Sequence, residues 1–232
     1  ELKNLNKEIN FIFSSSATVY GDPKTLPITE SEPIKKAESP YGNTKQIGEE
    51  IIKDLVNSSF NFKAISLRYF NPIGAHPSAL IGELPIGIPQ NLVPYITQTA
   101  IGKRNELTVF GDNYLTRDGS CIRDYIHVVD LAKAHIKSLE KLIKESSKNY
   151  YDVFNIGTGK GTSVLELISC FESVSGKKLN FKIGERRKGD VAKCFADVFK
   201  ANELLNWKSK HSIEDALLSS WNWEKHIKNE KL

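Results

Sequence analysis

Tyr41 and Lys45, four positions apart, are the pair of side chains that most directly suggests a catalytic role. If this part of the chain is helical, a separation of four residues places both side chains on one helix face. An ammonium group beside a phenol favours the phenolate through charge proximity. Because tyrosine ordinarily titrates near pH ~10, such help would let Tyr41 act as a base at neutral pH. The isolated pair also fits an ordinary amphipathic helix, so its surroundings decide its meaning.

The segment upstream of this pair combines an apolar strand with a run of serines. Residues 9–14 predict a buried strand, and Ser14, Ser15 and Ser16 end it. A serine-rich strand end before Tyr-x-x-x-Lys resembles the active-site layout of the short-chain dehydrogenase/reductase superfamily. Over almost the whole chain, further blocks resemble the UDP-glucose 4-epimerases of its extended branch, in the same order: Leu67–Pro77, Gly87–Leu92, Arg123–Val128, Phe154–Gly159 and Arg186–Val191.

This resemblance implies an isomerase of galactose metabolism that inverts C4 of UDP-galactose and UDP-glucose. Hydride would pass to and from a tightly held NAD, with a 4-keto sugar as the intermediate. Tyr41 would take the proton of the 4-hydroxyl, Lys45 would bind the nicotinamide ribose, and Ser16 would hydrogen-bond the 4-oxygen. The residues expected to bind NAD are Ser14, Ser16, Tyr41, Lys45, Tyr69 and Phe70.

The resemblance also implies a set of residues that bind the UDP-hexose. Arginine side chains form charge-assisted bonds with diphosphate oxygens, and the start of a helix is a natural anion site. Arginine and aspartate at these positions equally fit surface ion pairs when each is taken alone. The expected substrate-binding residues are Ser16, Thr18, Asn71, Asn91, Leu92, Thr108, Phe110, Arg123, Arg187, Asp190 and Cys194.

Cys194 stands where this family carries either a bulky tyrosine or a smaller residue facing the sugar. A cysteine would leave room for an N-acetyl group, so we expect UDP-GalNAc and UDP-GlcNAc to be substrates as well. An inert buried thiol is the alternative.

Composition excludes several other classes of protein. Hydrophobic residues make up 40% and charged residues 26% of the 232, as in globular domains. No apolar run approaches the ~20 residues of a membrane span, and a net charge of +4, spread along the chain, does not favour nucleic-acid binding. Three cysteines favour a reducing, cytoplasmic compartment over a disulfide framework. No metal site is expected.

Alternating strand and helix patterns predict an α/β fold, with a partial Rossmann-type parallel sheet and a smaller mixed α/β substrate domain. Residues 1–70 are expected to form the carboxyl-terminal part of the NAD-binding domain. Residues 71–232 are expected to form mainly the UDP-sugar-binding domain, with segments that return to the first. Predicted strands cover residues 9–14, 63–69, 107–110, 152–156 and 179–183. Predicted helices cover residues 41–58, 91–102, 129–146, 164–175, 198–205 and 212–228.

The glycine-rich run of residues 157–162 lies between a strand and a helix, as a phosphate-binding loop would. It matches neither Gly-x-x-x-x-Gly-Lys-Ser/Thr nor Gly-x-Gly-x-x-Gly, so we interpret it as a structural turn. The resemblance also bears on where the chain begins. A complete epimerase opens with a strand, a glycine-rich turn and a helix. The chain lacks both that opening and an initial Met, so we expect roughly the first third of the fold to be missing. The resemblance further implies a homodimer whose helical interface includes residues 41–58.

Three alternatives remain open. A nucleotide-sugar dehydratase would need a carboxylic acid and a carboxylate near the sugar, and Ala17 and Thr18 occupy the positions where dehydratases of this superfamily carry Asp and Glu. A decarboxylase or a UDP-sugar reductase is a second alternative. The third is a non-catalytic fragment, or a module that binds only the UDP-sugar.

Overall fold

A computed structural model describes residues 8–58 and 61–230 of the chain. The chain divides into two compact units, and each is described by itself. Unit 1 comprises Glu1–Phe70, Leu131–Gly159 and Phe195–Lys208, and unit 2 comprises Asn71–Asp130, Lys160–Cys194 and Ser209–Leu232. Among the described residues, none of the helices combines the length and the hydrophobicity of a membrane span.

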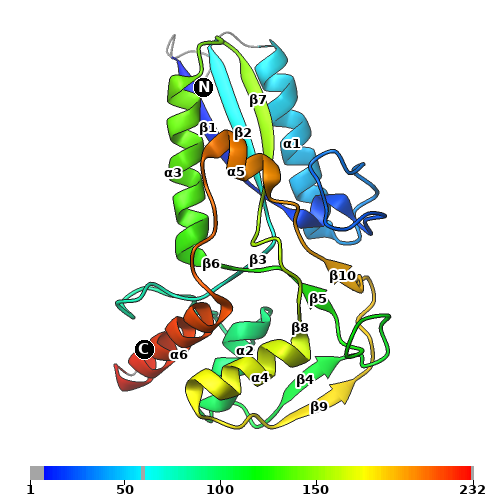
Figure 1. The fold of residues 1–232 in the computed structure, drawn as a ribbon, viewed down its shortest axis with the longest axis vertical. Helices are drawn as coiled ribbons and strands as arrows, with labels where there is room; N and C mark the ends of the chain where they lie inside the picture. The colour runs from blue at the N-terminus through cyan, green and yellow to red at the C-terminus, as the bar shows by residue number, and fades with distance from the viewer. Residues whose placement is uncertain (1–7, 59–60, 231–232) are drawn as a thin grey trace. The chain divides into compact units, whose positions relative to one another are not determined.

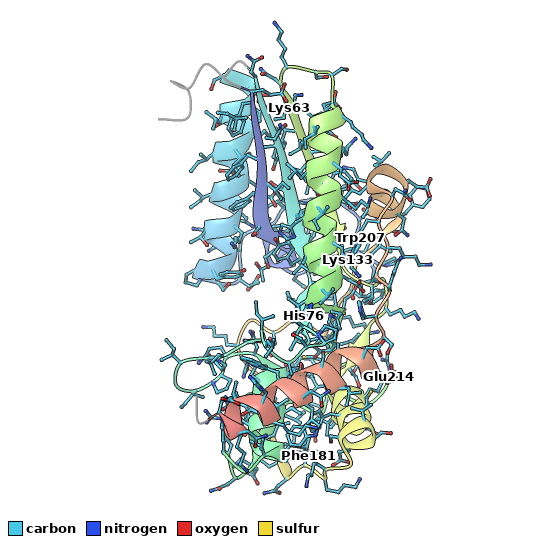
Figure 2. All side chains as sticks on the ribbon, turned by 90° about the vertical axis from the view of Figure 1, so that its left-hand side faces the viewer. Lys63, His76, Lys133, Phe181, Trp207 and Glu214 are labelled. Carbon is cyan, nitrogen blue, oxygen red and sulfur yellow. The ribbon has the colours of Figure 1, made fainter. Side chains whose placement is uncertain are left out.

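Unit 1 is built on a parallel three-stranded sheet in the order β1 (Ile9–Ser16), β2 (Phe62–Tyr69), β7 (Tyr150–Ile156). The sheet lies between helix α1 (Pro40–Ser58) on one face and helix α3 (Val128–Lys144) on the other (Figures 1 and 2). Parallel strands need crossover connections, which here are helical, and helices therefore cover both faces. The carboxyl ends of β1 and β2 lie together, because Ser16 pairs in register with Tyr69.

Helix α1 packs on the sheet through an apolar cluster. Ile52 and Val56 of the helix contact Phe62 and Ala64 of β2, and the partly buried members of the cluster are Ile9, Phe11, Phe13, Leu55 and Tyr151. Burying such a side chain contributes about 1.5–3 kcal/mol. Gly48 allows the close approach, because a Cβ there would lie 2.5 Å from Cζ of Phe13.

Two short elements complete unit 1. The 3-10 helix η2 (Ala17–Tyr20) follows β1 directly and begins at Ser16, whose side chain accepts from Thr18 N. Helix α5 (Phe199–Leu205) ends at Asn206, which adopts the left-handed conformation.

The described residues of unit 2 combine small sheets with three helices. Two parallel pairs join β3 (Asn71–Ile73) to β6 (Tyr125–His127), and β4 (Leu107–Phe110) to β9 (Phe181–Gly184). A third sheet has the order β10 (Lys193–Cys194), β5 (Ile122–Arg123), β8 (Thr162–Ser163). The helices are α2 (Leu92–Ala100), α4 (Val164–Ser175) and α6 (Ile213–Asn229).

The core of unit 2 lies between these helices and strands. Phe171 of α4 meets Trp221 of α6 edge to face, with ring centroids 5.8 Å apart. The buried residues of the core are Ile73, Val93, Ile96, Leu107, Val109, Tyr125, Leu167, Ile168, Phe171, Leu179, Ala216, Leu217 and Trp221.

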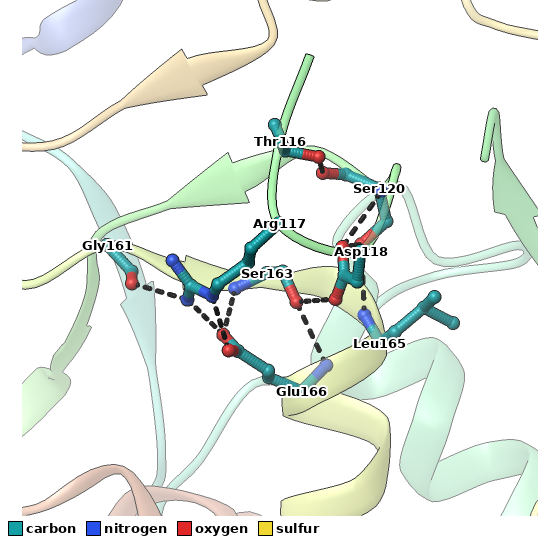
Figure 3. A network of polar contacts seen from close by, with 8 residues as sticks. All are labelled: Thr116, Arg117, Asp118, Ser120, Gly161, Ser163, Leu165 and Glu166. Carbon is teal, nitrogen blue, oxygen red and sulfur yellow. Dashed lines mark hydrogen bonds and ion pairs between the residues drawn. The ribbon is translucent and has the colours of Figure 1, made fainter. Parts of the chain in front are cut away.

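A polar network holds the start of α4 (Figure 3). Ser163 Oγ accepts from Glu166 N at 3.1 Å, and Glu166 Oε2 accepts from Ser163 N at 2.8 Å, which makes a capping box. Arg117 forms an ion pair with Glu166 and donates to Gly161 O at 2.9 Å. Asp118 accepts from the Ser163 hydroxyl. The glycine-rich run thus leads into a capped structural helix.

The predicted α/β class with a parallel sheet is confirmed, whereas two short strands lie where the sequence predicted neither strand nor helix. Strand β5 lies between the predicted strand 107–110 and the predicted helix 129–146, and strand β3 lies between the predicted strand 63–69 and the predicted helix 91–102. Each is two or three residues long and is held by a distant partner strand. A strand this short has no period that a sequence pattern could reveal.

Candidate active site

The amino end of α1 carries Tyr41 and Lys45. The helix begins at Pro40, where proline's fixed φ is favourable, and Ser39 Oγ accepts from Gly42 N at 3.1 Å. The Tyr41 side chain is 55% exposed. Lys45 Nζ lies 5.4 Å from the centroid of the Tyr41 ring and donates to Ser14 O at 2.8 Å. Lys45 therefore joins the phenol-bearing helix to the serine-rich end of β1.

The serines at this strand end have different partners. Ser16 is buried, and its Oγ accepts from Thr18 N at 3.2 Å and from Thr18 Oγ1 at 3.0 Å. Ser14 Oγ is hydrogen-bonded to the phenol oxygen of Tyr69 at 2.8 Å. Phe70 follows Tyr69, is buried, and donates its backbone N–H to Ile156 O at 3.2 Å.

Tyr69 is held as a neutral phenol. Burial raises the pKa of Tyr69, the hydrogen bond with Ser14 acts against this, and the charge of Tyr41 adds to the increase. Its oxygen also bonds with His135 Nε2, and His135 Nδ1 lies 2.9 Å from Leu131 O. Of the two tyrosines, the exposed Tyr41 with its neighbouring ammonium is the better candidate base.

The predicted sugar- and phosphate-binding residues of unit 2 form a first group around β5 and β10. Arg123 pairs in register with Cys194. Its guanidinium donates to Val191 O at 2.8 Å and lies 3.4 Å from Asp190 Oδ1. Burial raises the pKa of the Cys194 thiol to about 11. This small side chain is therefore uncharged at neutral pH. Arg123, Asp190 and Cys194 are thus neighbours.

A second group of predicted substrate-binding residues comprises Thr108 and Phe110 of β4 and Arg187, which contacts Phe110. The guanidinium of Arg187 stacks over the Phe110 ring, 4.0 Å from its centroid. Thr108 lies two residues before Phe110 on the same strand face. Beside it, Arg186 stacks over Tyr114 at 4.1 Å and bonds with Asn113.

The remaining predicted substrate residues occupy the starts of β3 and α2. Asn71 donates its backbone N–H to Asp124 O at 2.9 Å. Asn91 is the N-cap of α2 but makes no side-chain cap bond. Its amide instead donates to Glu83 Oε1 at 2.7 Å, and Leu92 is the first helical residue.

Sequence reasoning missed three polar residues of unit 1 that touch or adjoin the predicted site. These are His135, which bonds with Tyr69, and the buried ion pair of Glu49 and Arg68. A signal for the pair exists in the sequence. Arg68 lies in a strand that is otherwise largely apolar, and a buried charged side chain is rarely unpaired. Glu49, one helical turn after Lys45, could therefore have been considered as its partner.

The parallel sheet between helices, with a Tyr–Lys helix at a serine-rich strand end, defines a Rossmann-type α/β protein of the short-chain dehydrogenase/reductase kind. The chain belongs to the family described as GDP-mannose 4,6 dehydratase, whose model matches residues 1–219.

Individual relatives are similar over nearly the whole chain. UDP-glucose 4-epimerase of Drosophila melanogaster is 48% identical over 224 residues, which are 97% of this chain and 64% of that protein. A crystal structure of the Stenotrophomonas maltophila UDP-glucose-4-epimerase, with bound NAD and formylated UDP-arabinopyranose, matches with TM-score 0.91 and 45% identity over 95% of this chain and 65% of that one. The Bifidobacterium longum enzyme with NAD+ and UDP matches with TM-score 0.88 and 47% identity, over 95% and 64%. The chain thus spans a little under two thirds of the proteins it matches.

Proposed function

We propose that the protein is a UDP-glucose 4-epimerase, an isomerase that interconverts UDP-galactose and UDP-glucose. The observation that carries the proposal is the position of Lys45, whose ammonium lies near the Tyr41 ring and bonds to the carbonyl of Ser14. Relatives near 50% identity that are named UDP-glucose 4-epimerase, and similar structures with NAD and UDP-sugar ligands, support it.

In this proposal Tyr41 exchanges the proton of the sugar's 4-hydroxyl. The Lys45 ammonium lies 5.4 Å from the centroid of the Tyr41 ring, beside the phenol that would exchange this proton. Ser16, held by Thr18, orients the 4-oxygen through a hydrogen bond. Arg123 and Arg187 neutralise the diphosphate, and Asp190 accepts from a ribose hydroxyl. Thr18, Asn71, Asn91, Leu92, Thr108, Phe110 and Cys194 complete the proposed substrate contacts.

The donor set of unit 1 fits a nicotinamide ribose. The Lys45 ammonium carries three N–H donors, and one of them bonds to the Ser14 carbonyl at 2.8 Å. The other N–H groups could donate to ribose hydroxyls. Ser14, Tyr69 and Phe70 would complete the contact. When bound, NAD would supply the reversible oxidation of C4.

The activity in the family's description, dehydration, lacks its acid and base here. Ala17 is buried and apolar, and the hydroxyl of Thr18 donates to Ser16 Oγ. Neither side chain can supply the carboxylic acid and the carboxylate that elimination of water from C5–C6 requires. Epimerisation would need a proton exchange at the 4-oxygen, the role proposed for Tyr41, and the reversible oxidation of C4 that bound NAD would supply.

The test is turnover of UDP-galactose by the purified protein, followed by chromatographic separation of UDP-glucose, with NAD assayed in an acid extract. We expect UDP-glucose to form and NAD to be retained. Binding of UDP without NAD or turnover would favour the UDP-sugar-binding module instead. Loss of both would favour a non-catalytic fragment.

We further propose that the enzyme accepts UDP-GalNAc and UDP-GlcNAc. The support is the small, uncharged thiol of Cys194 beside Arg123. Cys194→Tyr should lower kcat/KM for the N-acetyl sugars by about 10- to 100-fold, because a filled pocket excludes the larger substrate. UDP-galactose turnover is the control. Unchanged turnover of both N-acetyl sugars would refute this specificity.

We also propose that the protein is a cytoplasmic homodimer. A low cysteine content favours a reducing compartment. Helix α1 exposes Ile47 and Ile51. Burial of these side chains between two copies would remove apolar surface from water.

A further inference from the structure

A buried ion pair in unit 1 lies directly behind the proposed catalytic residues. The side chains of Glu49 and Arg68 are each 5% exposed. Arg68 donates from Nε to Glu49 Oε1 at 2.9 Å and from Nη2 to Glu49 Oε2 at 2.6 Å, so the pair is bidentate. The Ser15 hydroxyl donates to the same Oε1. One carboxylate thus joins a helix to two strands.

The sequence positions of these three residues connect them to the site. Glu49 follows Lys45 by one helical turn and Tyr41 by two, so all three lie along one face of α1. Ser15 lies between Ser14 and Ser16. Arg68 pairs in register with Ser15 and precedes Tyr69.

Stability alone is a poor explanation for this arrangement. Removing two charges from water costs several kcal/mol per ion, and apolar side chains of similar volume often stabilise a fold as well or better. Arg68 Nη1 is buried without a hydrogen-bond partner among the described residues. Burial acts to lower the pKa of Arg68, yet the bonds and charges of Glu49 and Tyr20 leave that pKa above its ordinary value, so the guanidinium stays charged.

The ion pair adds directional hydrogen bonds to the packing of α1 on the sheet. The apolar contacts of Ile52 and Val56 with β2 hold the helix on the sheet, but such contacts are not directional. The two bonds between Arg68 and Glu49, together with the bond from the Ser15 hydroxyl, need particular distances and angles. They would break if the helix slid along the sheet. The Arg68 guanidinium is itself held, 4.7 Å from the centroid of the Tyr20 ring.

We propose that Glu49, Arg68 and Ser15 form a positioning unit that fixes α1 along β1 and β2, and so holds Tyr41 and Lys45 at the strand end formed by Ser14 and Ser16. The kinetic consequence rests on the proposed epimerase function. The structural consequence, the bond between Lys45 and Ser14 O, does not.

The main test is the double variant Glu49→Leu/Arg68→Met, which replaces the pair with apolar groups and leaves no unpaired buried charge. We expect a thermal unfolding midpoint close to that of the unchanged protein and an unchanged KM for UDP-galactose. We expect kcat to fall by about 100-fold, the loss that a misplacement of about 1 Å can cause. Asp152→Asn, which breaks the Lys200–Asp152 ion pair elsewhere in unit 1, is the control and should leave kcat unchanged.

A second variant separates geometry from charge. Arg68→Lys keeps the positive charge but cannot form the planar fork. If the fork positions the helix, this variant should also lose kcat with KM unchanged. Retention of full activity would show that charge alone suffices and would overturn the proposed role.

A readout independent of turnover is the rate at which an amine-reactive reagent labels Lys45, measured by mass spectrometry relative to exposed Lys53 on the same helix. The ratio should rise in the double variant, because Lys45 loses its bond to Ser14 O. Wild-type kcat and an unchanged ratio would overturn the proposal, as would a double variant that does not fold. If the unchanged protein has no epimerase activity, the proposed function fails, and the labelling ratio alone decides the positioning role.

Discussion

The ammonium of Lys45 donates to Ser14 O and lies 5.4 Å from the centre of the Tyr41 ring. Replacing it should therefore affect chemistry far more than folding. We expect Lys45→Met to lower kcat by about 100-fold or more, the range that general acid–base groups contribute. The thermal unfolding midpoint should change little. The matched control is Lys53→Met, two turns further along the same helix, which should keep full activity.

Tyr41 allows a second test at the residue scale. Tyr41→Phe removes the phenolic oxygen but keeps the ring, and the side chain is largely exposed, so the fold should be retained. We expect epimerase activity to fall by about 100- to 10,000-fold while UDP still binds. Steady-state kinetics and calorimetry of UDP binding measure the two effects. Activity near that of the unchanged protein would assign the base to another residue.

Residue types in the sequence indicated Tyr41, Lys45 and the strand-end serines, because spacing along a helix and a strand fixes local geometry. They did not indicate which polar groups are already engaged. Arg187 stacks on Phe110, and Arg123 lies against Asp190 and bonds to Val191 O. These partners are more than sixty residues apart in the chain, so only the folded structure reveals them.

At the scale of elements, the start of α4 provides a pH-dependent stabilisation. Bonds with Arg117 hold the pKa of Glu166 near 2, against 4.5 for an ordinary glutamate. A depressed pKa means that the contribution is fully present above pH 4.5 and is lost as the pH falls from 4.5 towards 2. We expect Glu166→Gln to lower the free energy of unfolding at pH 7 by about 1 kcal/mol, the usual value of a cap with an exposed ion pair.

The measurement for Glu166 is urea denaturation of both proteins at pH 7 and at pH 3. The difference in unfolding free energy should shrink at the lower pH, because protonation removes the charge that the variant already lacks. Glu203→Gln, at an exposed position of α5 outside this network, is the control for removing one carboxylate. A difference that stays constant with pH would contradict the role of the Arg117 ion pair.

Local patterns predicted the long elements and missed the short ones. Helix α4 was predicted over residues 164–175 and has these bounds, because apolar periodicity and a serine cap are both local signals. Strands β3, β5, β6, β8 and β10 have two or three residues each. Such strands exist because a distant segment offers hydrogen-bond partners.

For the whole molecule, the proposed homodimer can be tested by measuring the molar mass of the protein in solution. Ile51 is 61% exposed on α1, and a charge at this position would be buried without a partner in a helix-to-helix interface. We expect Ile51→Glu to halve the mass measured by light scattering after gel filtration. Leu115→Glu, on an exposed position of unit 2, should leave the mass unchanged. An unchanged mass for Ile51→Glu would exclude α1 from the interface.

Hydrophobic periodicity and residue spacing were enough to predict the α/β class, the long strands and helices, and the Tyr–Lys pair beside a serine-rich strand end, because each of these depends on one or two neighbouring elements. Only the tertiary structure revealed the bidentate bond between Glu49 and Arg68, the partner of Tyr69 in His135, and the pairing of Arg123 with Cys194. Hydrogen bonds and ion pairs act over a few ångströms. Their partners are therefore decided by which distant segments the fold brings within that range.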